Sequence, residues 1–381
     1  MIEPISATLA PSALQILWFI LIAVLWTGYL VLEGFDFGVG MLLNILPRGN
    51  KEQKEVEKRL LINTIGPVWD GNEVWLLTAG GATFAAFPYW YATLFSGFYL
   101  ALLLILVALI FRGVAFEYRG AINDAGWRQK FDWCLAVGAW LPALLWGVAF
   151  GNLVRGVALE ANAFGNLDYN GGLFPLLNPF SIVGGLTTLV LFLLHGSVFV
   201  ALKTDGDMRD RANALAGKLG LVAIVVAGGW AIWAQLAYGK AWTWIAVAVA
   251  ALALVAAVLA NKVKREGWAF FFSALVMPAA VALIFGSMYP YAIPGLGDGE
   301  GLSLMAASST NYTLTVMTVV ACIFTPIVLA YTAWTYWIFR RRLSTKDIPP
   351  PHGLSLKVIK EAAFGKEAPP AAPPVDAPAP A

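Results

Sequence analysis

Four carboxylate side chains lie in two short motifs of an otherwise apolar sequence. Glu33 and Asp36 occur in the segment LEGFDFGVG at 32–40, and Asp70 and Glu73 occur in WDGNEVW at 69–75. A spacing of three places both carboxylates of a motif on one face of a helix. A carboxylate at the centre of a membrane helix costs roughly 2.5–3.5 kcal/mol, so it needs a partner or a hydrated path. We interpret these four residues as candidates for a proton pathway.

The first pair allows two interpretations. Gly34, Gly38 and Gly40 give this segment a small-residue surface, against which another backbone can pack closely. Glu33 and Asp36 are then either a paired charge within a helix-packing seam or protonatable groups that face a hydrated route. The recurrence of the spacing in the second motif favours the protonatable groups.

The second pair is flanked by side chains that also suit a structural role. Trp69 and Trp75 stand on either side of the pair, and Asn72 adds an amide donor and acceptor between them. The helix dipole favours a carboxylate at a helix N-terminus, and tryptophans anchor helices at membrane interfaces. This simpler account fits Asp70, but it explains the pairing with Glu73 less well.

Arg112 ends the third apolar segment on the same side as these carboxylates. Short connections favour neighbouring helices, so Arg112 is placed to neutralise Asp36 or Asp70. The alternative is an ordinary basic residue at a membrane border. We expect Glu117 and Arg119, which follow closely, to be interfacial.

Histidine and cysteine provide little for haem or metal chemistry. His195 is the one histidine in an apolar segment, because His352 lies in the polar C-terminal part. Haem b sites use axial histidines, some with methionine, so one histidine cannot serve several haems. We expect His195 to be structural, and Cys134 and Cys322 to be small buried apolar side chains. We assign no catalytic, metal or confident cofactor ligand, no nucleotide-binding loop and no nucleic-acid partner.

The composition predicts an all-α polytopic membrane protein. The chain is 59% hydrophobic and 13% charged, whereas globular proteins are roughly half apolar and about a quarter charged. Apolar runs of the length that a bilayer requires, about 20 residues, recur between charged borders. They predict nine membrane spans at Leu14–Ile45, Gly66–Phe87, Tyr91–Phe111, Phe131–Val154, Phe180–Leu202, Leu219–Leu236, Trp242–Asn261, Ala269–Tyr289 and Tyr312–Phe339.

The boundary between the second and third spans is not marked by charged residues and has to be inferred. No charged residue occurs from Val74 to Phe111, a run too long for one helix. Pro88 and the aromatic residues after it supply a break and an interfacial group. We therefore predict a tight hairpin there. The charged segment from Lys51 to Arg59 is predicted to be a short surface helix or an extension of the second span.

The positive charges predict the orientation. With nine spans, all but two of the 25 Lys and Arg residues fall on one side, and the exceptions are Arg155 and Lys240. By the positive-inside rule the N-terminus is outside and the C-terminus is cytoplasmic. The first twelve residues contain no Lys or Arg, which argues against a cleavable signal peptide.

The chain divides into a membrane domain, residues 1–343, and a tail, residues 344–381. The tail is rich in Pro and Ala, and this composition predicts disorder. The segments Glu160–Pro179 and Pro290–Asn311 are longer than a bare connection requires. We interpret them as loops, with contact surfaces as the alternative.

Five segments together resemble the signature of cytochrome bd oxidase subunit II. They are LEGFDFGVG at 32–40, GPVWDGNEVWLL at 66–77, GGATFAAFP at 80–88, SGFY at 96–99 and RGVAFEYR at 112–119. The resemblance is dense over residues 15–120 and looser to about residue 342. One departure is Val68, which stands where the family often has a histidine and removes one proton carrier.

The resemblance implies a heterodimer in a bacterial plasma membrane. Its haem-bearing subunit I would hold two b haems, haem d and the quinol site, and each subunit would form two four-helix bundles plus one peripheral helix. This chain would stabilise subunit I, contact membrane lipid and contribute Asp70, with Asp36 and Arg112, to cytoplasmic proton delivery. A structural quinone in this subunit and a small accessory subunit are left open. The alternatives are an ion-coupled secondary transporter and a purely structural scaffold subunit.

Overall fold

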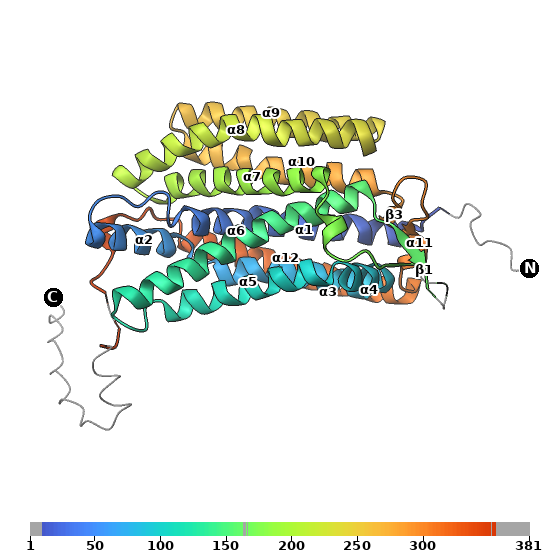
Figure 1. Cartoon of the computed structure of the whole chain (residues 1–381), viewed down its shortest axis with the longest axis horizontal. Helices are drawn as coiled ribbons and strands as arrows, with labels where there is room; N and C mark the ends of the chain where they lie inside the picture. The colour runs from blue at the N-terminus through green and yellow to red at the C-terminus, as the bar shows by residue number, and fades with distance from the viewer. Residues whose placement is uncertain (1–9, 163–164, 166, 352, 356–381) are drawn as a thin grey trace, which may run out of the picture.

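The computed structural model describes residues 10–162, 165, 167–351 and 353–355. Long helices run along one common axis (Figure 1), which confirms the mostly helical membrane fold. Eight helices of the described residues are long and apolar enough to cross a membrane. They are α1 (Ala13–Leu42), α5 (Tyr99–Tyr118), α6 (Ala125–Arg155), α7 (Pro179–Lys203), α8 (Asp207–Tyr238), α9 (Trp244–Lys262), α10 (Glu266–Met288) and α12 (Asn311–Ile338).

Helix α3 (Trp69–Ala86) is shorter and more polar than these eight. It has 18 residues, which span about 27 Å at 1.5 Å per residue, close to the roughly 30 Å of a bilayer core. The polar residues Asp70, Asn72 and Glu73 lie in its first turns. Helix α2 (Lys51–Ile65) precedes it as a separate polar helix, in agreement with the predicted surface helix.

The helix break predicted at Pro88 is confirmed, but the tight hairpin predicted there is wrong. Pro88 ends α3 because it has no N–H to donate, yet it suits the first turn of a new helix. The chain therefore continues as the short helix α4 (Pro88–Gly97) before α5 begins at Tyr99. The third apolar helix starts eight residues later than the predicted Tyr91. Helix α8 differs too, because its polar first turns extend it back from the predicted Leu219 to Asp207.

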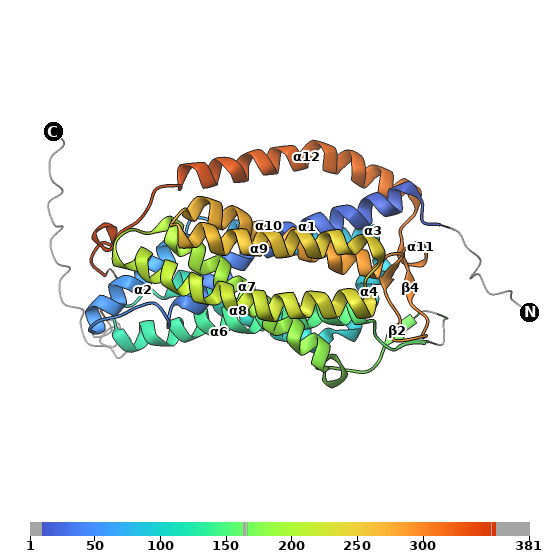
Figure 2. The ribbon, with the colours of Figure 1, turned by 90° about the horizontal axis from the view of Figure 1, so that it is seen from above.

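The helices pack in two groups around α1. In the first set α1 contacts α3 and α6, and α6 contacts α5, while α7, α8, α9 and α10 form a second set. The two sets meet where α1 and α6 pack against α7 (Figure 1). Helix α12 lies along one edge of the molecule (Figure 2) and contacts α1 and α3.

The contact between α1 and α7 depends on two glycines. A Cβ placed on Gly38 would lie 2.2 Å from the carbonyl oxygen of Phe192 and 2.6 Å from the Cα of Gly196. Only the absence of side chains allows this approach. The small-residue surface predicted around Gly38 is confirmed.

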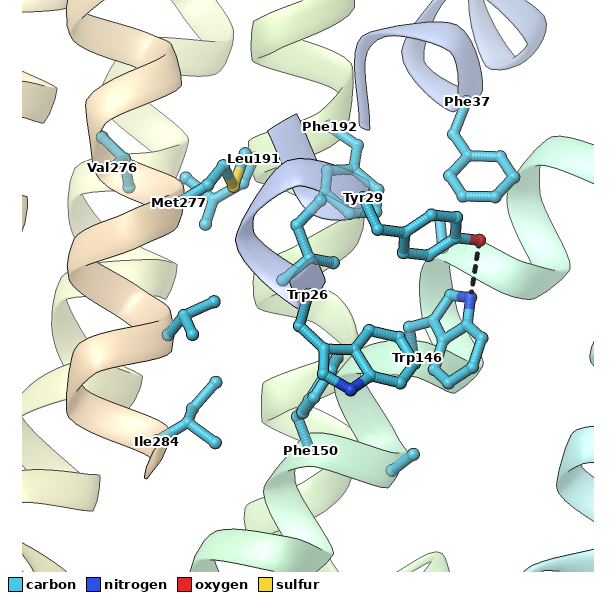
Figure 3. Packing of buried hydrophobic residues seen from close by; sticks show 14 of the residues in the cluster. Trp26, Tyr29, Phe37, Trp146, Phe150, Leu191, Phe192, Val276, Met277 and Ile284 are labelled. Atoms are coloured by element: carbon cyan, nitrogen blue, oxygen red, sulfur yellow. Dashed lines mark hydrogen bonds between the residues drawn. The ribbon is translucent and has the colours of Figure 1, made fainter. Parts of the chain in front are cut away.

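Aromatic side chains fill the core beside this crossing (Figure 3). Trp26 packs edge-on against Trp146 and Phe150, with ring centroids 4.9 and 5.1 Å away. The Trp146 indole N–H donates to the Tyr29 hydroxyl at 3.1 Å. These contacts fix α1 against α6, and with it the depth of the charged residues on α1.

Most basic side chains gather at one end of the molecule, which we call the basic end. It comprises α2, the α5–α6, α7–α8 and α9–α10 connections and the segment after α12 (Figure 1). Arg119 is 5% exposed there, with ion pairs to Glu55 at 2.9 Å and Asp132 at 2.6 Å. It is therefore buried, whereas we expected an interfacial side chain. Of its five N–H donors, three form hydrogen bonds with these two carboxylates.

Two small hairpins cover the opposite end. Strands β1 (Leu159–Ala161) and β2 (Leu167–Tyr169) are antiparallel, as are β3 (Tyr291–Ile293) and β4 (Leu302–Ser303). A bridge from Val157 to Gly295 joins the two loops. The short helices η1 (Phe174–Leu176), η2 (Ala241–Thr243) and α11 (Leu304–Ala307) complete this end.

The first residues of the expected tail pack against the basic end. Helix η3 (Thr345–Asp347) follows α12, and Arg59 donates to the carbonyl of Pro349 at 2.7 Å. Leu354 exchanges backbone hydrogen bonds with Ala121 and Asn123 at 2.9 and 3.0 Å. Residues 356–381, which include the Pro/Ala-rich part, lie outside the described residues.

Candidate functional site

The carboxylates of α1 lie inside the protein. Helix α1 begins with a capping box formed by Ser12 and Gln15, which satisfies its first amides, and then runs without interruption to Leu42. Glu33 and Asp36 are both 0% exposed. A helix this apolar delivers two carboxylates to the core only if other residues compensate for their burial.

Arg112 on α5 compensates for Glu33. Its guanidinium forms an ion pair and hydrogen bond with Glu33, and both side chains are completely buried. The same guanidinium lies 4.8 Å from the Phe37 ring centroid and 5.4 Å from that of Phe116. The predicted partner is correct in part, because Arg112 acts electrostatically on Asp36, but its direct ion pair is with Glu33 and none is formed with Asp70 among the described residues.

Asp36 is held by an amide instead of a cation. Asn72 on α3 is 2% exposed and donates through Nδ2 to Asp36 Oδ2 at 2.7 Å. The hydroxyl of Tyr336 on α12 donates to Asn72 Oδ1, also at 2.7 Å. This chain of hydrogen bonds joins three helices that are distant in sequence.

Sequence reasoning missed Tyr336. A tyrosine near the end of the last apolar segment fits an interfacial aromatic residue, so its type alone does not distinguish the two roles. The sequence did indicate a similar depth in the membrane for the two residues. Tyr336 lies just before the basic residues that begin at Arg340, and Asn72 lies near the start of its apolar segment on the same predicted side.

The second carboxylate pair does not act as one unit. Asp70 is exposed, whereas Glu73 is partly buried, and within the described residues neither has a hydrogen bond or ion pair. Glu73 interacts electrostatically with both Arg112 and Asp70. Glu73 therefore lies between the exposed Asp70 and the buried cluster of Glu33, Asp36, Asn72 and Arg112.

The motif tryptophans pack against neighbouring helices. Trp69 stacks on Phe116 of α5 with ring centroids 4.6 Å apart. The Trp75 ring fills the space over Gly28 of α1, where an added Cβ would lie 2.2 Å from it. Both residues fix α3 against the helices that supply Glu33 and Arg112.

Four polar atoms of the cluster have no hydrogen-bond partner among the described residues. They are Glu33 Oε2, Asp36 Oδ1, Arg112 Nε and Arg112 Nη2. Buried polar atoms of this kind are normally satisfied by ordered water. One guanidinium also faces the three carboxyl groups of Glu33, Asp36 and Glu73. The arrangement suits a hydrated site that binds and releases protons.

His195 is occupied by protein contacts on both ring nitrogens. Nδ1 lies 2.8 Å from Ser273 Oγ and Nε2 lies 3.1 Å from the carbonyl of Val31, and the ring stacks on Phe270. The predicted structural role is confirmed. A haem iron could take this histidine only after one of these hydrogen bonds was broken, so the residue does not fit an axial ligand.

The cysteines differ from the expectation. Cys134 is partly buried and Cys322 is exposed on α12, because the outer face of α12 is uncovered in the isolated chain. No group of three or more His, Cys, Asp or Glu side chains that could hold a metal occurs within the described residues.

An apolar cavity of about 450 Å³ lies beside α3, α4 and α5. Its lining includes Trp26, Phe98, Trp146 and Phe285, together with Trp90. Trp90 is 2% exposed, and its indole N–H has no acceptor among the described residues. The cavity thus combines an apolar wall with one buried hydrogen-bond donor.

The chain is similar to proteins of one family. Residues 14–339 match the family model described as cytochrome bd terminal oxidase subunit II. The "Cytochrome bd ubiquinol oxidase subunit 2" of Bacillus subtilis is 40% identical over 346 residues, covering 88% of this chain and 98% of that protein. The "Cytochrome bd-I ubiquinol oxidase subunit 2" of Escherichia coli K12 is 37% identical over 372 residues, covering 88% and 97%.

A solved structure shares the fold. A chain of the bd oxidase from Geobacillus thermodenitrificans matches with a TM-score of 0.69 and 11% identity, covering 86% of this chain and 98% of that one. At this identity the match concerns the fold alone.

Proposed function

The chain belongs to the cytochrome bd terminal oxidase subunit II family, and from this premise we propose that it provides part of the proton route of a bd-type quinol oxidase. The family makes it a multi-pass membrane subunit of an oxidoreductase complex that contains haem. In our proposal subunit I holds the two b haems, haem d and the quinol site, and this chain stabilises that subunit. The complex would lie in a bacterial plasma membrane.

The observation that carries this proposal is the buried cluster of Glu33, Asp36, Asn72 and Arg112. Reduction of dioxygen to water consumes one proton per electron, so the oxidase needs a proton supply through its apolar interior. Protonatable groups that are buried and only partly paired are a feature of proton paths through membranes. Asp70 would receive protons at the surface, and Glu73 would pass them to the cluster.

The proposed orientation follows from the basic end. Helix α3 would serve as the ninth span, with the basic end facing the cytoplasm. Asp70 would then be near the cytoplasmic border. In a variant that lacks Cys134 and Cys322, single cysteines introduced at Lys264 and at Asp298 test this orientation, because an impermeant thiol reagent outside intact cells should label only the second.

The exposed faces of α3 and α12 suit a partner helix. Gly80 and Gly81 have no atom within 4 Å of an added Cβ, which leaves a flat surface for close approach. Leu314 is the one buried residue among those described on α12. Subunit I would cover these faces and enclose Asp70.

The cavity beside α3–α5 fits a structural quinone. Its apolar lining suits an isoprenoid chain, and the Trp90 indole N–H would donate to a quinone carbonyl. No electron-transfer step is assigned to it.

Asp36→Asn and Asp70→Asn test the proton route in the complete oxidase. We expect each to slow quinol-driven oxygen consumption about a hundredfold, the lower end of the range for losing a proton-transfer group, while the haem spectrum is retained. The control is Asp298→Asn, an exposed carboxylate at the opposite end. Full activity in Asp36→Asn and Asp70→Asn would leave only the scaffold role, and a stable colourless chain without a haem-bearing partner would favour the transporter.

A further inference from the structure

Helix α12 is held to the rest of the described chain by few polar contacts. At one end Trp18 Nε1 donates to Leu314 O at 3.1 Å and to Thr318 Oγ1 at 3.0 Å. Towards the basic end, Tyr336 donates to Asn72 of α3, and Lys203 of α7 donates to the carbonyl of Phe339, the residue that caps α12. Thr318 and Tyr336 are separated by about 27 Å of helix. Tyr336 therefore links the edge helix of Figure 2 directly to the cluster.

The two hydrogen bonds of Asn72 fix the direction of its amide. An amide oxygen only accepts and an amide nitrogen only donates, whereas a phenol hydroxyl does both. With Tyr336 donating to Oδ1, the NH₂ group faces Asp36 and matches an ionised carboxylate. If Asp36 binds a proton on Oδ2, the oxygen that faces Asn72, this oxygen becomes a donor and requires the amide oxygen instead.

We propose that Tyr336 is a positioning residue that keeps Asn72 hydrogen-bonded in both protonation states of Asp36. When Asp36 is protonated on Oδ2, the amide of Asn72 turns over, so that its Oδ1 accepts from the carboxyl group and its Nδ2 donates to the phenol oxygen. The proton remains on Asp36, and Tyr336 neither gains nor loses one. This inference rests on the proposed function, because it assumes that Asp36 exchanges protons during turnover.

Among the described residues around Asp36, the Tyr336 phenol is the one group placed to hydrogen-bond Asn72 in both orientations of its amide. Glu33 on α1, Glu73 on α3 and Arg112 on α5 also face the Asp36 carboxylate electrostatically. Arg112 can only donate, and its contact is with Glu33. Without the phenol, Asn72 would leave one buried polar group unpaired in each state, and each change of protonation would be slower.

Tyr336→Phe in the complete oxidase tests this inference. We expect oxygen consumption to fall at least about fivefold, the lower end of the effect of one buried group left unpaired, with the haem spectrum unchanged. The solvent deuterium isotope effect on turnover should rise, because proton transfer becomes slower than the other steps. The control is Tyr291→Phe in β3 at the opposite end of the molecule, where the side chain is 40% exposed.

A double-mutant cycle with Asn72→Leu separates positioning from anchoring of α12. If Tyr336 acts through Asn72, adding Tyr336→Phe to Asn72→Leu should slow turnover no further. A further loss, or loss of the haem spectrum in Tyr336→Phe, would overturn the inference in favour of anchoring. Normal turnover of Tyr336→Phe beside a slow Asp36→Asn would overturn it while leaving the proton route intact. Normal turnover of both Asp36→Asn and Asp70→Asn would overturn the route itself.

Discussion

Removal of Arg112 should destabilise the protein far more than removal of the whole ion pair. Arg112 and Glu33 are both fully buried, so Arg112→Leu leaves a carboxylate without its cation. Breaking a buried pair in this way costs about 3–5 kcal/mol, or roughly a hundredfold to several thousandfold in the folding equilibrium. Replacing both residues by apolar side chains is often close to neutral.

The structure favours the neutral result for the double variant Glu33→Leu with Arg112→Leu. The rings of Phe37 and Phe116 already border the guanidinium, so leucines would meet apolar neighbours. Asp36 keeps its hydrogen bond from Asn72, which does not involve Arg112. Most of the stability lost in Arg112→Leu should therefore return.

The assay is denaturation of the purified complex by increasing detergent or temperature, followed by the haem spectrum. Arg112→Leu should lower the midpoint strongly, and the double variant should recover most of that loss. Lys264→Leu serves as the control, because its pair with Asp210 is solvent-exposed and contributes little. A double variant as unstable as Arg112→Leu would refute the reasoning and show that the arginine acts through other contacts.

Two further substitutions test the packing and the cavity. Gly38→Val should lower the free energy of unfolding by about 1–3 kcal/mol or prevent assembly, because the added side chain overpacks against Gly196. The control Gly228→Val, with no atom within 4 Å of an added Cβ, should assemble normally. Equal yields of the two variants would contradict the close crossing. Trp90→Phe should lower the amount of quinone extracted from the purified complex. The control Trp244→Phe, at an exposed site, should leave that amount unchanged. An unchanged amount of quinone in Trp90→Phe would exclude the Trp90 indole as the hydrogen-bond donor.

The sequence alone determined the membrane class and the helices that carry the candidate residues. Long uncharged runs between charged borders can satisfy their backbone groups in lipid only as helices, so their existence did not depend on tertiary contacts. The glycines around Gly38 predicted a close helix crossing, because residues without side chains allow two backbones to approach closely. The boundaries near Pro88 were less predictable, because proline both ends a helix and suits the start of the next.

The tertiary structure decided which charged residues meet. Spacing placed Asp70 and Glu73 on one face, yet the rotation of α3 leaves Asp70 exposed and brings Asn72 to Asp36. The partner of Arg112 depends on the depth at which α5 brings its side chain to Glu33, and the role of Tyr336 depends on the return of α12 to α3. Such contacts join segments up to 264 residues apart. No local pattern encodes them, because packing of the whole bundle sets helix rotation and depth.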